Sequence, residues 1–135
     1  MPLRKLAAGF ADFQRDMFIP KRQFFEQLAL KQQPKIAMIA CSDSRVDPAI
    51  LTNAEPGDIF MVRNVANLVP PCERERDEDK HGTTAALEFA VVSLEVEHII
   101  VFGHVDCGGI KALLTNDPTI AAQHEFIPQL ARHCR

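Results

Sequence analysis

Several features that would assign this 135-residue chain to a common class are missing from it. No apolar run approaches the roughly 20 residues that a membrane-spanning helix needs. The net charge is −3, so nothing indicates a basic surface for nucleic acid or for an anionic membrane. The basic N-terminal stretch has too short an apolar run for a signal peptide, and we therefore expect a cytoplasmic protein.

Cysteine is also scarce, and the four present are Cys41, Cys72, Cys107 and Cys134. Four are few for a disulfide scaffold, so we expect thiols or metal ligands. No C-x-x-C pair occurs, which argues against a redox-active dithiol, and the G-x-G-x-x-G spacing of dinucleotide-binding proteins is absent. A phosphatase loop that began at Cys41 would need arginine six positions later, where the chain has Asp47.

Three short apolar runs predict the strands of a sheet. They are "PKIAMIACS" (34–42), "DIFMVRNVAN" (58–67) and "HIIVFGH" (98–104). Their apolar residues are continuous rather than alternating, which is typical of strands buried on both faces of a parallel sheet.

Helices are predicted before, between and after these runs. The first segment, 3–30, reads as two helices broken at Pro20, and the segment 83–98 places Leu87, Ala90, Val91 and Leu94 at helical spacing. Another helix is expected from Cys107 onward, with breaks at Pro118 and Pro128. The alternation predicts an α/β fold, with an open, mostly parallel sheet flanked by helices, in one domain over 1–135.

Residues with metal-binding and acid–base chemistry follow the predicted strands. Cys41, Asp43 and Arg45 follow the first, Arg63-Asn64 ends the second, and the third ends in His104-x-x-Cys107. Open α/β sheets bind ligands beyond the carboxyl ends of their strands, so these side chains should meet at one edge.

Two thiolates and an imidazole are typical zinc ligands, and three protein ligands leave a fourth position open. Cys107 also stands where a helix should begin, and the free N–H groups there favour its thiolate. Read singly, Cys41 could be a core residue, His104 a structural histidine, and Asp43 with Arg45 a loop ion pair.

Four segments, "CSDSR", "RNVAN", "TTAALEFAV" and "HIIVFGHVDCGG", occur in an order that resembles the β-class carbonic anhydrases, from about residue 20 to about residue 115. The resemblance implies that Cys41, His104 and Cys107 bind Zn²⁺ and that Asp43 and Arg45 form the catalytic dyad. It implies hydration of carbon dioxide to bicarbonate by a zinc-bound hydroxide, with Asp43 as the fourth zinc ligand in a closed state. It also implies a homodimer or a higher homo-oligomer.

The chain departs from the family in two respects. Val105 follows the metal-binding histidine, where the family has serine, and the chain ends before the C-terminal third of the family domain. We therefore expect a C-terminally truncated domain with apolar surface left bare. Two alternatives stay open: a carbon disulfide or carbonyl sulfide hydrolase on the same scaffold, and a non-catalytic, zinc-stabilised subunit.

Overall fold

The computed structural model of the chain describes residues 1–71 and 82–115. The chain divides into two compact units, residues 1–32 and 33–135. Cys72, Cys134 and the helix with breaks at Pro118 and Pro128 lie outside the described residues. Within the described residues, no helix is both long and apolar enough to cross a membrane.

The first unit consists of helices, as predicted. Helix α1 (Pro2–Phe13) continues into the π-helical turn η1 (Gln14–Phe18), and α2 (Arg22–Leu30) follows a turn at Pro20. Phenylalanine rings join the two helices, with ring centroids 5.7 Å apart for Phe13 and Phe25. The two helices therefore share a small aromatic contact, although both remain largely exposed.

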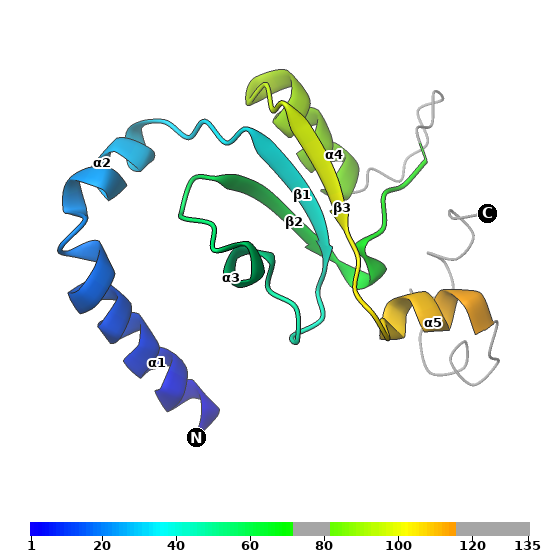
Figure 1. The fold of residues 1–135 in the computed structure, drawn as a ribbon, viewed down its shortest axis with the longest axis horizontal. Coiled ribbons are helices and arrows are strands. Elements are labelled where there is room, and N and C mark those ends of the chain that lie inside the picture. The colour runs from blue at the N-terminus through cyan, green and yellow to red at the C-terminus, as the bar shows by residue number, and fades with distance from the viewer. Residues whose placement is uncertain (72–81, 116–135) are drawn as a thin grey trace. The chain divides into compact units, whose positions relative to one another are not determined.

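The second unit is built on a parallel sheet, which confirms the predicted fold class. Its strands are β1 (Ile36–Cys41), β2 (Ile59–Asn64) and β3 (His98–Phe102), in the order β2-β1-β3 (Figure 1). The register pairs Cys41 with Asn64 and Ala40 with Phe102. The carboxyl ends of the strands therefore lie together at one edge of the sheet.

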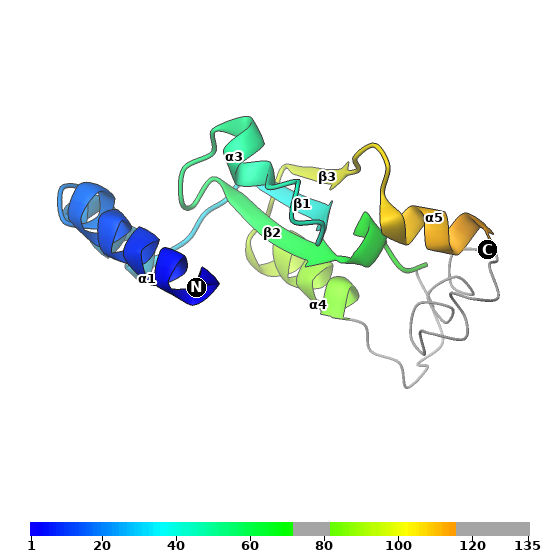
Figure 2. The same cartoon turned by 90° about the horizontal axis from the view of Figure 1, so that it is seen from below.

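Helices lie on both faces of this sheet and beyond its carboxyl edge. Helix α3 (Pro48–Thr52) is on one face, and α4 (Gly82–Glu88) with the π-helical turn η3 (Phe89–Ser93) is on the other (Figure 2). Phe89 packs on Phe60 of β2, with ring centroids 5.8 Å apart. Helix α5 (Gly108–Thr115) begins just beyond β3, as predicted.

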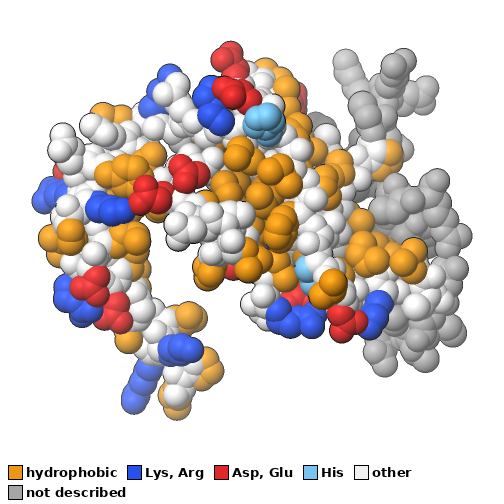
Figure 3. Space-filling model, in the orientation of Figure 1, with side chains coloured by type: hydrophobic (Ala, Val, Ile, Leu, Met, Phe, Trp, Pro, Cys, Tyr) orange, Lys and Arg blue, Asp and Glu red, His pale blue; other side chains and the backbone are white. Residues whose placement is uncertain are grey.

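Burial of the strands differs from the prediction. The middle strand β1 is buried, and β2 is half-buried. The prediction of a third buried strand is wrong, because Ile99 and Val101 of β3 are 51% and 53% exposed. Figure 3 shows hydrophobic side chains gathered over this part of the sheet. In the described part of the chain β3 is an edge strand.

The helix predicted over 83–98 ends earlier than its periodicity indicates. The α-helix ends at Glu88, the π-helical turn that continues it ends at Ser93, and Glu95 takes a left-handed backbone conformation with φ 53°. Ala90 is fully buried, whereas Val91 is 51% exposed, so the predicted apolar side holds only in part. The early stop lets the chain turn back, and Glu97 and His98 donate their N–H groups to the Lys35 carbonyl.

Candidate metal centre

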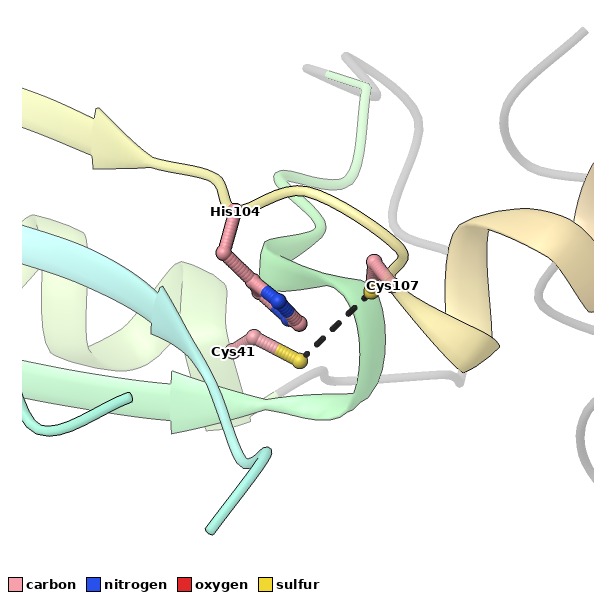
Figure 4. Close-up of side chains that lie close together, drawn as sticks. All are labelled: Cys41, His104 and Cys107. Carbon is pink, nitrogen blue, oxygen red and sulfur yellow. Dashed lines mark hydrogen bonds between the residues drawn. The ribbon is translucent and has the colours of Figure 1, made fainter. Parts of the chain in front are cut away.

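Three side chains meet beyond the carboxyl edge of the sheet. Cys41 is the last residue of β1, while His104 and Cys107 belong to the segment that joins β3 to α5 (Figure 4). One ligand atom from each lies within 4.8 Å of the others. The two Sγ atoms are 3.7 Å apart. Two sulfurs bound to one tetrahedral zinc, with Zn–S distances of about 2.3 Å, lie about 3.8 Å from one another, so the observed spacing fits a shared zinc ion.

The imidazole of His104 is oriented as a metal ligand would be. Nδ1 lies 3.0 Å from the Val105 carbonyl, which can only accept, so Nδ1 carries the hydrogen. Nε2 is buried and has no hydrogen-bond partner among the described residues. A buried, unpartnered nitrogen beside two thiols fits a zinc ion. The side chain of Val105 is 91% exposed.

The two cysteines belong to a buried apolar cluster of the fold. Cys41 and Cys107 are each 5% exposed and pack with the fully buried Ala66. Burial of the sulfur raises the pKa of the Cys41 thiol, but His104, the N–H groups of Asp43 and Ala66, and Cys107 together lower it to about 7. The surroundings therefore favour the thiolate that a metal requires.

Asp43 and Arg45 form a tight pair beside this cluster. Arg45 donates from its backbone N–H and Nε to Oδ1 of Asp43, both at 2.9 Å, and from Nη2 to Oδ2 at 2.7 Å. These hydrogen bonds hold the pKa of Asp43 well below its usual range. Oδ2 is also 3.8 Å from Nε2 of His104. Asp43 therefore presents an ionised carboxylate toward the candidate ligands.

Arg45 also connects the two segments that carry the candidate ligands. Its Nη2 donates to the backbone carbonyl of Asp106 at 3.2 Å. Asp106 itself has a left-handed backbone, with φ 56°, and forms an ion pair with Lys111 of α5. One guanidinium thus contacts both the turn after β1 and the turn after β3.

A turn that the sequence did not indicate closes the site on the β2 side. It is the 3₁₀ turn η2 (Val65–Asn67), in which Ala66 and Asn67 have left-handed φ values of 67° and 46°. Asn64 supports it, because its amide donates to the Leu68 carbonyl and accepts from the Leu68 N–H. Alanine gives no sequence signal for such a conformation, so Ala66 was missed as a neighbour of Cys41.

Gly109 permits this turn to approach α5. A Cβ on Gly109 would stand 2.8 Å from the Cβ of Ala66 and 3.0 Å from its backbone nitrogen. A side chain at position 109 would therefore force the turn and α5 apart. At Gly82 and Gly108, by contrast, no atom within the described ranges lies within 4 Å of an added Cβ.

The chain matches the family model described as "Carbonic anhydrase" over residues 36–135. This chain belongs to the β-carbonic anhydrase family. It is 47% identical over 114 residues to "Beta carbonic anhydrase 6, mitochondrial" of Arabidopsis thaliana, an alignment that covers 84% of this chain and 38% of the plant protein. The chain spans about two fifths of the length of the curated relatives it matches.

Solved members of the family share the fold. The structure of the β-carbonic anhydrase CcaA superposes with a TM-score of 0.90 at 37% identity, over 99% of this chain and 63% of CcaA. A tetrameric β-carbonic anhydrase from Sordaria macrospora gives a TM-score of 0.68 at 34% identity, over 97% of this chain and 58% of the fungal one. The predicted family and fold are both confirmed.

Proposed function

We propose that the chain catalyses the reversible hydration of carbon dioxide to bicarbonate with a zinc ion held by Cys41, His104 and Cys107. The observation that carries this proposal is the cluster of three ligand atoms within 4.8 Å of one another, with the Nε2 of His104 buried and unpartnered among the described residues. The activity of the Arabidopsis, CcaA and Sordaria relatives supports the same reaction.

Zinc, when bound, would lower the pKa of a water molecule so that hydroxide is available near neutral pH. The protein's own contribution begins with Asp43, whose Oδ2 lies beside the ligand cluster. As an ionised carboxylate it accepts a hydrogen bond from the attacking oxygen and directs that oxygen's lone pair toward the carbon of carbon dioxide.

Arg45 holds the Asp43 carboxylate ionised and in a fixed orientation. A guanidinium that donates to both carboxylate oxygens fixes the plane of the carboxylate as well as its charge. Its further bond to the Asp106 carbonyl fixes the position of the pair relative to the His104–Cys107 segment. We also propose that Asp43 serves as the fourth ligand in a closed state, in which carbon dioxide hydration stops.

The proposal extends to assembly and location. Tetrameric relatives and the exposed apolar side chains of β3 support a homodimer or a higher homo-oligomer. We propose a single catalytic domain over residues 1–135 and a cytoplasmic location. Neither nucleic acid nor a membrane is proposed as a partner.

A stopped-flow assay of carbon dioxide hydration, with zinc content measured on the same sample, tests the proposed reaction. We expect close to one zinc per chain and hydration above the uncatalysed rate. Full zinc occupancy without hydration would favour a non-catalytic, zinc-stabilised subunit. Hydrolysis of carbonyl sulfide or carbon disulfide by the same sample, without carbon dioxide hydration, would favour the alternative substrates.

A further inference from the structure

Arg63, near the end of β2, donates to three backbone carbonyls of one neighbouring turn. Its Nε lies 2.9 Å from the Cys41 oxygen, and its Nη2 lies 2.8 Å from the Asp43 oxygen and 2.6 Å from the Val46 oxygen. Arg63 pairs with Ala40 in the sheet, so its side chain lies where β1 ends. A single guanidinium therefore donates hydrogen bonds to three of the backbone carbonyls of residues 41–46.

These carbonyls belong to a stretch of chain that leaves the sheet after Ser42. The last ladder-type bond is from Ser42 N–H to the Asn64 carbonyl, and after it the chain curls away from β2. Inside the turn, the Val46 N–H donates to the Asp43 carbonyl at 3.2 Å. Guanidinium donors have a fixed planar geometry, so carbonyls bound to them are fixed relative to one another.

We propose that Arg63 is a positioning residue for the metal centre. By holding the carbonyls of residues 41, 43 and 46 on one side of the turn, it presents the Cys41 thiolate and the Asp43 carboxylate toward His104. The inference rests on the proposed metal site and assigns to Arg63 a role that its place at the end of a strand does not indicate by itself.

Arg63 has a second contact that could account for its presence. Its Nη1 is 3.7 Å from Oδ2 of Asp47, and both side chains are partly exposed, at 31% and 48%. An ion pair of this length and exposure contributes little. Asp47 has its own role, because its carboxylate accepts from the N–H groups of Ala49 and Ile50 at the start of α3.

The experiment uses the full chain freed of metal and titrated with Co²⁺ alone, in competition with a chelator. Thiolate-to-cobalt and d–d absorption bands report the ligands and their geometry without any enzyme assay. Arg63→Lys keeps the charge but replaces the planar fork by one nitrogen. Arg63→Ala removes both, and ethylguanidinium added to that variant returns the missing group.

We expect Arg63→Lys and Arg63→Ala to bind Co²⁺ about 10-fold to 100-fold more weakly than the wild type, with altered d–d bands. Ethylguanidinium should partly restore the Arg63→Ala spectrum. Two controls should match the wild type. Asp47→Asn keeps the cap of α3 but removes the ion pair. Lys35→Ala removes an exposed ion pair to Glu97 next to the opposite end of β1.

Metal affinity and the Co²⁺ spectrum of the Arg63 variants decide between the positioning role and its alternatives. Wild-type affinity and spectrum in Arg63→Lys would overturn the positioning role, even if Arg63→Ala does not fold. Equal losses in Asp47→Asn and Arg63→Lys would overturn it in favour of the ion pair. A wild-type chain that binds no Co²⁺ would contradict the proposed metal site itself, whereas unaltered binding by the Arg63 variants would contradict only the role of Arg63.

Discussion

At the scale of single residues, the proposed reaction requires Asp43 to act as a hydrogen-bond acceptor beside the metal. Asp43→Asn keeps the size of the side chain but removes its charge and one acceptor oxygen. We expect zinc content to stay close to the wild-type value and hydration to fall by about 100-fold or more. Glu97→Gln, which breaks an exposed ion pair with Lys35, is the matched control and should keep its rate. An Asp43→Asn variant with a wild-type rate would reduce Asp43 to a partner of Arg45.

The pH dependence of activity follows from the same pair. Because Arg45 holds the pKa of Asp43 below its usual range, the carboxylate stays ionised in mild acid as well as in alkali. A decline in activity from about pH 8 to about pH 6 therefore cannot come from protonation of Asp43. If Asp43 competes with hydroxide for zinc, activity should rise with pH in the wild type. A rate profile that falls toward alkaline pH would contradict this competition.

At the scale of elements, the strands could be predicted better than their surroundings. Continuous apolar runs predicted the positions of β1, β2 and β3. Because parallel strands have their carboxyl ends at the same edge of a sheet, the sequence also predicted that Cys41, His104 and Cys107 lie together there. The three carbonyl contacts of Arg63 could not be predicted, since they depend on how a turn curls 17 to 22 positions earlier. Periodicity also could not show that Glu95 reverses the chain after Ser93.

Contact between helix α5 and the turn η2 gives a prediction at this scale. Gly109→Ala forces a Cβ against Ala66 and Val65, at 2.8 and 2.9 Å, so the turn or α5 must shift. We expect a loss of about 1 to 3 kcal/mol in unfolding free energy, together with weaker zinc binding because Cys107 precedes α5. Gly108→Ala meets open space within the described residues and serves as the control. Equal stability and zinc affinity in the two variants, by urea unfolding and chelator competition, would contradict the tight contact.

At the scale of the whole molecule, the exposed strand β3 should govern association. Ile99 and Val101, on the same face, are about half exposed, and apolar edge strands of this kind promote pairing between chains. We expect the wild type to associate as its concentration rises, in sedimentation velocity experiments. The double variant Ile99→Lys/Val101→Lys should associate less, whereas Ile50→Lys on α3, 79% exposed in the wild type, should not change association. A wild type that stays monomeric at all concentrations would contradict the prediction.

The whole proposal requires that Cys41, His104 and Cys107 hold one zinc ion. X-ray absorption at the zinc edge of the purified chain tests it most directly, because it counts sulfur and nitrogen neighbours without reference to activity. We predict two sulfurs at about 2.3 Å and one imidazole nitrogen at about 2.0–2.1 Å, with a lighter atom as the fourth neighbour. Cys41→Ser should remove one of the sulfurs, and Cys107→Ser the other. A zinc shell without sulfur, or one that both variants leave unchanged, would contradict the account.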